Sequence, residues 1–270
     1  MNKSYLADRE NVGDKMLLDR VIAVRNTKTV FRDGNKCIKV FKETHAKSEV
    51  LNEALNLAHA EELGLRVPHF YGIEVYDGKW AIVYEYIRGQ SLSQLMHVHP
   101  DQMMTWLELF VNLQLEIVSS HCPDLYPMKE KLSQYISASI LEPSLRYEMI
   151  EEMEQLPFGD EVCHLDFNPS NIILTDDEVP YIIDWAHMVK GNASADAAVS
   201  WLNFSYHSDP ETANSYLELF SQKRNITRDL IYKWIPFAGA GRSVKRNNQE
   251  RDFLLTKAKE YWKSQWRSEL

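Results

Sequence analysis

Three side chains that carry oxygen atoms occur close together in the middle of the sequence, at a spacing that could support catalysis. Asp166 is followed five positions later by Asn171, and the apolar pair Ile182-Ile183 then leads into Asp184. Asp166 suits a base that orients an attacking hydroxyl, and amide and carboxylate oxygens such as those of Asn171 and Asp184 are ligands that Mg²⁺ prefers. Each residue alone could simply form a turn. Together, His-x-Asp-x-x-x-x-Asn and a later strand ending in Asp predict phosphoryl transfer.

The part of the chain before this motif is predicted to form a small antiparallel sheet with one helix. β-branched and apolar stretches broken by Asp33-Gly34 and Asp77-Gly78, both strong hairpin signals, predict five strands. The strands are expected at residues 21–24, 29–32, 36–41, 70–75 and 79–87. Between them, apolar residues at three- and four-residue steps predict a helix over 47–63 that Gly64 ends.

The rest of the chain is mainly helical by the same criteria. Helices are predicted over residues 101–121, where Asp101 can act as the cap, and over 128–141 and 143–156. The polar segment 162–171 is expected to be irregular and to precede two short strands at 172–175 and 181–184. This order predicts an α+β fold with a sheet lobe over residues 1–88 and a helical lobe over 89–270. A ligand is expected in the cleft between two such lobes.

The charge and the distribution of apolar residues restrict the kinds of partner that the protein is expected to bind. Thirty Lys and Arg against 39 Asp and Glu give a net charge of -9, which argues against nucleic-acid binding because that needs a basic surface. No apolar run reaches the roughly 18 residues of a membrane span, and the N-terminal residues lack a signal-peptide core. The three cysteines lack the paired spacing of a zinc site or a disulfide framework. This fits a reducing compartment, so we expect a cytoplasmic protein.

The motif residues make the chain resemble the aminoglycoside phosphotransferase and choline kinase family, small-molecule kinases with a protein-kinase-like two-lobe fold. The resemblance extends from about Val21 to the helices after Asp196. It implies that Asp166 is the catalytic base and that Asn171 and Asp184 hold Mg²⁺. It further implies that His164 supports the loop structurally and that Asp196 anchors the loop backbone.

The resemblance also implies that the sheet lobe binds ATP. Lys39, between apolar neighbours in the segment 37–41, is the candidate for contacting the phosphates. Its partner is expected from the following helix, where Glu53 is best placed and Glu49, one turn earlier, is the alternative.

Two further nucleotide contacts are predicted. The segment 81–89 resembles the family's hinge, in which backbone groups near Glu85 and Ile87 would bond the adenine edge. The phosphate loop is expected around residues 25–29, but it contains no glycine. Thr27, Thr29 or backbone amides must therefore replace the Gly-x-Gly cradle of protein kinases.

The acceptor is predicted to be a hydroxylated small molecule. After Asp184 there is no Ala-Pro-Glu motif and little room for an activation loop, which disfavours a protein substrate. Acidic and aromatic residues of the helical lobe could hold a cationic amine. A basic run of Arg242, Lys245, Arg246 and Arg251 could instead hold an anion, although an exposed helix face is the simpler expectation.

Three alternatives to the main prediction stay open at this point. A protein Ser/Thr kinase would use the same catalytic residues. A nucleotide-binding scaffold with little activity would explain the missing glycines. An aminoglycoside resistance enzyme is a narrower form of the same prediction, because a fold does not fix its substrate.

Overall fold

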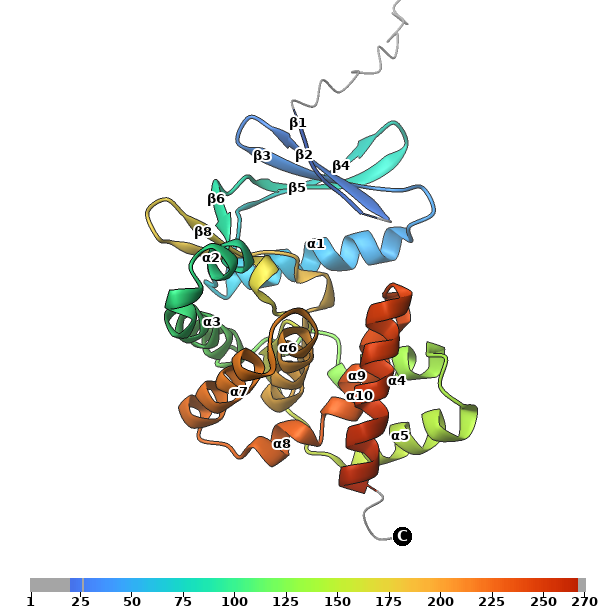
Figure 1. Ribbon diagram of the computed structural model, residues 1–270. Helices are drawn as coiled ribbons and strands as arrows, with labels where there is room; N and C mark the ends of the chain where they lie inside the picture. The colour runs from blue at the N-terminus through green and yellow to red at the C-terminus, as the bar shows by residue number, and fades with distance from the viewer. Residues whose placement is uncertain (1–19, 26, 267–270) are drawn as a thin grey trace, which may run out of the picture. The chain divides into compact units, whose positions relative to one another are not determined.

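The computed structural model describes residues 20–25 and 27–266 (Figure 1). The chain separates into two compact units. The first comprises Met1–Ala54 and His69–Tyr86, and the second comprises Leu55–Pro68 and Ile87–Leu270. The boundary predicted between residues 88 and 89 separates a sheet lobe expected to bind ATP from a helical lobe, and it stays a prediction.

The first unit contains an antiparallel five-stranded sheet with the order β1-β2-β3-β5-β4 (Figure 1). Its strands are β1 (Arg20–Val24), β2 (Lys28–Asp33), β3 (Lys36–Phe41), β4 (Phe70–Tyr76) and β5 (Lys79–Glu85). Helix α1 (Lys47–Glu62) begins in this unit, where its buried residues Val50 and Ala54 pack against Phe41 and Ile82 of the sheet. This apolar contact fixes the start of α1 on one face of the sheet.

The predicted hairpins are confirmed, and their turn residues explain them. Asp33 pairs with Lys36 across the first turn, and Tyr76 pairs with Lys79 across the second. In the second turn Asp77 and Gly78 have φ angles of 47° and 77°, the left-handed conformation that a two-residue hairpin turn of this type requires. Between the two hairpins, β3 pairs with β5, and Lys39 lies opposite Ile82 in the middle of the sheet.

The second unit is mainly helical, as predicted. Its helices are α2 (Leu92–Val98), α3 (Met103–Val118), α4 (Met128–Ala138), α5 (Pro143–Gln155), α6 (Ala193–His207), α7 (Pro210–Arg224), α8 (Arg228–Tyr232), α9 (Ile235–Arg242) and α10 (Asn248–Trp266). Two small sheets interrupt them. One has the order β6-β8-β9, from Gly89–Ser91, Ile172–Thr175 and Pro180–Ile182. The other pairs β7 (Glu161–Cys163) with β10 (Val189–Gly191).

The start of the helix predicted at residue 101 is wrong. Pro100–Gln102 forms a separate 3-10 turn, and α3 begins at Met103 without a side-chain cap. The capped helix nearby is α2, where Ser91 and Gln94 form a reciprocal capping box. Asp101 therefore lies in the short 3-10 turn between α2 and α3, because Pro100 favours starting a new turn at its own position.

An aromatic cluster joins three helices of the second unit to the segment that carries the motif. Phe110 of α3 contacts Phe167, Phe204 of α6 and Tyr216 of α7, with ring centroids 4.5, 5.0 and 5.6 Å apart. All four side chains are buried. Phe167 directly follows Asp166, so this cluster holds one end of the motif against the helices. Among the described residues, no helix combines the length and apolar character that crossing a membrane would need.

Candidate active site

The backbone just before Asp166 is held in a strained conformation by a buried carboxylate. Leu165 has a φ of 55°, a left-handed conformation that costs a branched residue of order 1–3 kcal/mol. Its N–H donates to Oδ1 of Asp196 at 2.7 Å, and Gln114 donates to the other oxygen at 2.8 Å. Asp196 thus has the anchoring contact that the family resemblance implied.

Further hydrogen bonds complete this buried network. Ser200 accepts a hydrogen bond from Gln114 at 3.1 Å and donates to the carbonyl of Phe167 at 2.8 Å, while Tyr216 donates to Gln114 Oε1 at 2.8 Å. Burial raises the pKa of Asp196, and the hydrogen bonds from Gln114 and Leu165 oppose that rise. The network clamps the loop on both sides of Asp166, because it bonds the residue before and the residue after it.

His164 is a structural residue, as expected. Its side chain is fully buried, and its Nδ1 accepts from the Asp166 N–H at 3.3 Å. Its Nε2 therefore carries the proton and donates to the carbonyl of Ile183 at 3.2 Å. Burial lowers the pKa of His164, which keeps the ring neutral. The ring thus links the Asp166 loop to the residue before Asp184.

The structure brings the three predicted chemistry-bearing residues together. Asn171 donates from Nδ2 to the Asp166 carbonyl at 2.9 Å, and its own carbonyl accepts from the Ile183 N–H at 2.9 Å. Asp184 follows in the left-handed conformation, with φ 65° and ψ 59°. Its charge acts on the carboxyl of Asp166.

The chain on either side of Asp184 is held by the segment Leu55–Pro68, which contains the end of α1 and belongs to the second unit. Buried Asn56 donates from Nδ2 to the carbonyl of Trp185 at 2.9 Å. The N–H of Ile182 donates to the carbonyl of Arg66 at 2.7 Å. These bonds fix the strand end that presents Asp184.

The residues fit a magnesium ion by their donor chemistry. Because the Nδ2 of Asn171 bonds a carbonyl, the amide is oriented with Oδ1 as its remaining polar atom. Asn171 Oδ1 and the Asp184 carboxylate are hard oxygen ligands, the kind that bind Mg²⁺ together with substrate phosphates and water.

Two arginines bind the carboxylate of Asp166. Arg242, at the end of α9, donates from Nη2 to Oδ1 at 2.7 Å and from Nη1 to the carbonyl of Leu165 at 2.9 Å. Arg246 donates to the same Oδ1 at 3.3 Å. The expectation that the basic run forms an exposed helix face is wrong for both, since their side chains are only 9% and 29% exposed. The sequence analysis identified this basic run but did not predict that it binds Asp166, which lies 76 residues from Arg242 in the chain.

These cations control the charge of Asp166. Burial alone would raise the pKa of its carboxyl, but Arg242, His187 and Arg246 outweigh that effect and lower it to about 2. Burial likewise lowers the pKa of His187 to about 3. Near neutral pH the group is therefore a carboxylate between guanidinium ions, with a neutral imidazole beside it.

In the first unit, the structure selects between the two partners considered for Lys39. Lys39 is 3% exposed and forms an ion pair with Oε1 of Glu53, which is 8% exposed. Glu49 instead pairs with His45 at 3.2 Å, and its side chain is 49% exposed. The buried pair Lys39–Glu53 is the arrangement that the sequence favoured.

The roles of the remaining nucleotide candidates stay predictions. The N–H of Glu85 donates to the carbonyl of His69 at 2.9 Å. Ile87 follows β5 outside regular structure and is half-buried. Thr27 is exposed in the bend before β2, and its carbonyl accepts from the Lys42 N–H at 2.9 Å.

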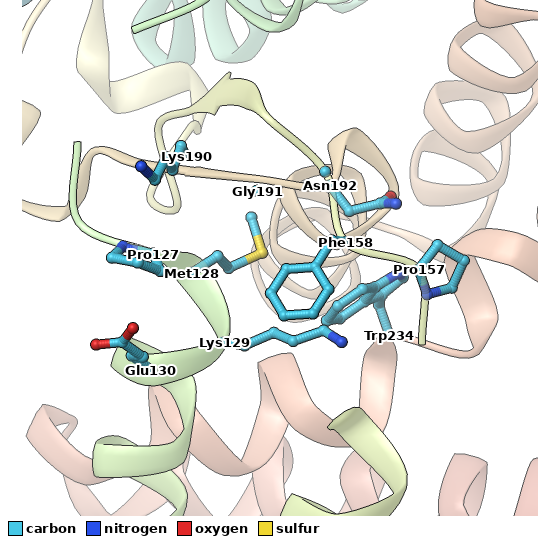
Figure 2. Close-up of a pocket in the computed structure, with 11 residues that line it drawn as sticks. Pro127, Met128, Lys129, Glu130, Pro157, Phe158, Lys190, Gly191, Asn192 and Trp234 are labelled. Atoms are coloured by element: carbon cyan, nitrogen blue, oxygen red, sulfur yellow. The ribbon is translucent and has the colours of Figure 1, made fainter. Parts of the chain in front are cut away.

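A small cavity of about 150 Å³ in the second unit contains none of the predicted site residues (Figure 2). Figure 2 shows Lys129 beside Phe158, and its Nζ lies 4.1 Å from that ring's centroid while donating to the Leu156 carbonyl at 2.6 Å. At Gly191, a Cβ would lie 2.5 Å from Met128 Cβ. These lining residues are engaged in contacts that hold the chain together.

Solved structures with the same fold come from small-molecule kinases. The choline kinase LicA from Streptococcus pneumoniae is 16% identical, with a TM-score of 0.65 over 90% of this chain and 91% of that one. An aminoglycoside-3'-phosphotransferase of type VIII is also 16% identical, with a TM-score of 0.59 over 91% and 92%.

A thermostable mutant of the aminoglycoside phosphotransferase APH(4)-Ia, in a ternary complex with AMP-PNP and hygromycin B, reaches a TM-score of 0.69 at 10% identity over 94% and 98%. These likenesses confirm the predicted protein-kinase-like fold class. No curated protein matches the sequence.

The sequence itself carries the family signal. Residues 23–230 match the phosphotransferase enzyme family, a stretch that contains Lys39, Asp166, Asn171 and Asp184. The match confirms the prediction of a phosphotransferase of the kind that the motif and the resemblance indicated. The chain belongs to the phosphotransferase enzyme family.

Proposed function

We propose that the protein transfers the γ-phosphoryl group of ATP to a hydroxyl of a small molecule in a magnesium-dependent reaction. The observation that carries the proposal is the convergence of Asp166, Asn171 and Asp184, linked by the Asn171 and His164 hydrogen bonds. Catalysis of this kind depends on alignment and on charge stabilisation. The hydrogen bonds that hold Leu165 and Phe167, on either side of Asp166, would supply the alignment.

Asp166 would orient the attacking hydroxyl. Its contacts with Arg242 and Arg246 use Oδ1, so Oδ2 is the oxygen that would accept the hydroxyl proton. A carboxyl with a pKa of about 2 is a weak base. Such a base suits a loose transition state, in which the hydroxyl keeps its proton until late in phosphoryl transfer and mainly needs to be oriented toward the γ-phosphorus.

Asn171 and Asp184 would hold the metal through Oδ1 and the carboxylate. Bound Mg²⁺ would neutralise charge on the β- and γ-phosphates. Solved relatives named in complexes with AMP and AMP-PNP support an adenine nucleotide as the donor.

Lys39 would contact the phosphates, and Glu53 would fix its ammonium group. The Glu85 carbonyl and the Ile87 N–H would bond the adenine edge, whereas Thr27 would lie in the loop over the phosphates. Within the described residues this loop contains no glycine, so side-chain hydroxyls and backbone amides would serve there.

A small acceptor is favoured over a protein by the chain after Asp184. A 3-10 turn (Trp185–His187), strand β10 and then α6 from Ala193 occupy this stretch, so no loop is available to form a peptide platform. We also propose that the protein works in the cytoplasm, because its three cysteines are buried free thiols, which suits a reducing compartment.

The proposal is tested by measuring ATP consumption with a panel of hydroxylated metabolites and antibiotics while Mg²⁺ is varied. Turnover with at least one acceptor is expected, and Asp184→Asn should raise the Mg²⁺ concentration for half-maximal rate about tenfold or more. Asp177→Asn is the matched control, since Asp177 lies in the exposed turn between β8 and β9. Magnesium-independent turnover, or an equal response of both variants, would remove Asp184 from the metal site.

A further inference from the structure

Tyr216 of α7 lies outside the sequence motif, but its hydroxyl belongs to the buried network that holds the Asp166 loop. The Tyr216 ring is fully buried and packs against the rings of Phe110 and Phe204, with centroids 5.6 and 5.1 Å away. These contacts fix the direction of the hydroxyl, which donates to Gln114 Oε1 at 2.8 Å. The two residues are 102 positions apart in the chain, so only the fold brings them together.

Gln114 of α3 connects this hydroxyl to two residues of α6. Its Nε2 donates to Asp196 Oδ2 at 2.8 Å and to Ser200 Oγ at 3.1 Å. Both hydrogens of the amide are therefore used, and Oε1 is the atom left to accept. Among the described residues, Tyr216 is the donor that Oε1 meets. An amide turned the other way would instead place Oε1 against the Asp196 carboxylate, where two acceptors would face each other.

The two acceptors of Gln114 lead to opposite sides of the proposed base. Asp196 Oδ1 accepts from the N–H of Leu165 at 2.7 Å, and Ser200 donates to the carbonyl of Phe167 at 2.8 Å. The side chains of this network are fully buried. Because bulk water does not reach them, a hydrogen bond that is removed has no ready replacement, and the neighbouring bonds weaken with it.

We propose that Tyr216 is a positioning residue for phosphoryl transfer, which fixes the backbone on both sides of Asp166 by holding the Gln114 amide. The inference rests on the proposed function, because it concerns the base of the same reaction. Leu165 has a φ of 55°, so a loosened anchor lets this strained turn relax and displaces the neighbouring carboxylate. Small displacements of a reacting group are costly when catalysis depends on alignment.

Tyr216→Phe tests the proposal, because it removes the hydroxyl and keeps the ring. It should lower kcat about 3- to 10-fold and leave the KM for ATP unchanged. Tyr261→Phe on α10 is the matched control, since the Tyr261 ring packs against Trp201 and its hydroxyl has no hydrogen-bond partner among the described residues. Ile136→Val, at a fully buried position of α4, controls for lost stability. An equal loss of kcat in either control, or a rise in KM alone, would overturn the proposal.

A double-mutant cycle tests whether Tyr216 acts through Gln114. Gln114→Met keeps a side chain of similar length but removes the amide that accepts from Tyr216 and donates to Asp196. In that background Tyr216→Phe should lower kcat no further, because the hydroxyl has no amide left to hold. Losses of kcat that simply multiply in the double variant would overturn the proposal, because they would show that Tyr216 acts by another route.

Amide hydrogen exchange gives a measurement that does not depend on activity. In the protein without substrates, Tyr216→Phe should speed exchange of the Leu165 N–H about tenfold or more relative to the N–H of buried Val111 on α3, and Tyr261→Phe should not. Such a change in a protein that phosphorylates no acceptor would uphold the loop anchor and contradict the kinase. Native turnover, with unchanged kcat and unchanged Leu165 exchange in Tyr216→Phe, would uphold the kinase and contradict the positioning role.

Discussion

Arg242 bonds Asp166 at its side chain and at the residue before it: Nη2 donates to Asp166 Oδ1 at 2.7 Å while Nη1 donates to the carbonyl of Leu165 at 2.9 Å. One guanidinium thus fixes both the carboxylate and the strained turn that presents it. Because Arg242 also carries a positive charge, the same contact sets the position and the ionisation of the proposed base.

Arg242→Gln should therefore change the pH dependence of the reaction. Without this cation, the burial that already raises the pKa of Asp166 is less opposed, and the pKa should move from about 2 toward or above the ordinary value. The variant should lose kcat/KM below about pH 5, where protonation of Asp166 would begin. In the native protein Asp166 should cause no such loss. Superimposable normalised profiles from pH 4.5 to 8, with Arg251→Gln as control, would contradict this account.

Asp196→Asn should lower kcat by disturbing the Asp166 loop. The two oxygens of Asp196 accept from Leu165 and from Gln114, and an amide can accept on only one side. One buried donor would lose its partner, at a cost of about 1–3 kcal/mol in the free energy of unfolding. Chemical denaturation and steady-state kinetics measure both effects. A variant with reduced stability but unchanged kcat would show that the anchor does not position Asp166.

Removing the acid from the buried ion pair should impair both stability and nucleotide binding. Glu53→Gln removes the carboxylate that pairs with the buried ammonium of Lys39, which should cost about 3–5 kcal/mol in the free energy of unfolding. The exposed Glu49 provides a matched control on the same helix, and Glu49→Gln should change stability by less than about 0.5 kcal/mol. Unfolding curves and ATP titrations distinguish the two. Equal effects of the two substitutions would show that the buried pair has no special role.

His187 should make the fold sensitive to acid. Its pKa in the folded protein, about 3, lies below the ordinary value of 6.5, so the unfolded chain binds more protons as the pH falls below 6.5. Stability contributed by the neutral ring is therefore present above pH 6.5 and declines toward pH 3. His187→Gln should flatten the fall in unfolding free energy between pH 7 and pH 5. Parallel curves for the two proteins would mean that other groups cause the decline.

The sequence predicted the parts of the site that depend on short-range pattern. Asp166, Asn171 and Asp184 lie within one loop and the following hairpin, so their spacing alone implied that they could meet. Lys39 and Glu53 are 14 residues apart on adjacent elements, and Glu53 was favoured because it falls within the helix and resembles the family's Glu-Ala segment. The hairpins followed from the two Asp-Gly signals: Asp77 and Gly78 are the turn residues of the second hairpin, whereas in the first Asp33 ends β2 and the turn is Gly34-Asn35.

What escaped the sequence analysis depends on distant contacts. Arg242 and Arg246 reach Asp166 from 76 and 80 residues away, and a basic run at the end of a helix has the same pattern whether it faces water or a buried carboxylate. Strands β6 and β10 have three residues each, too few for an alternating pattern to be recognised. Their positions come from pairing with β8 and β7.

The role of Asp166 is tested most directly by phosphoryl transfer from γ-labelled ATP to an acceptor identified in the panel, comparing Asp166→Asn with Asp177→Asn. Both changes replace a carboxylate by an amide of the same shape, and only the first touches the proposed base. Asp166→Asn should lower kcat by about 10²- to 10⁴-fold with the fold intact, and Asp177→Asn should leave it unchanged. Unaltered turnover by a folded Asp166→Asn protein would contradict the account.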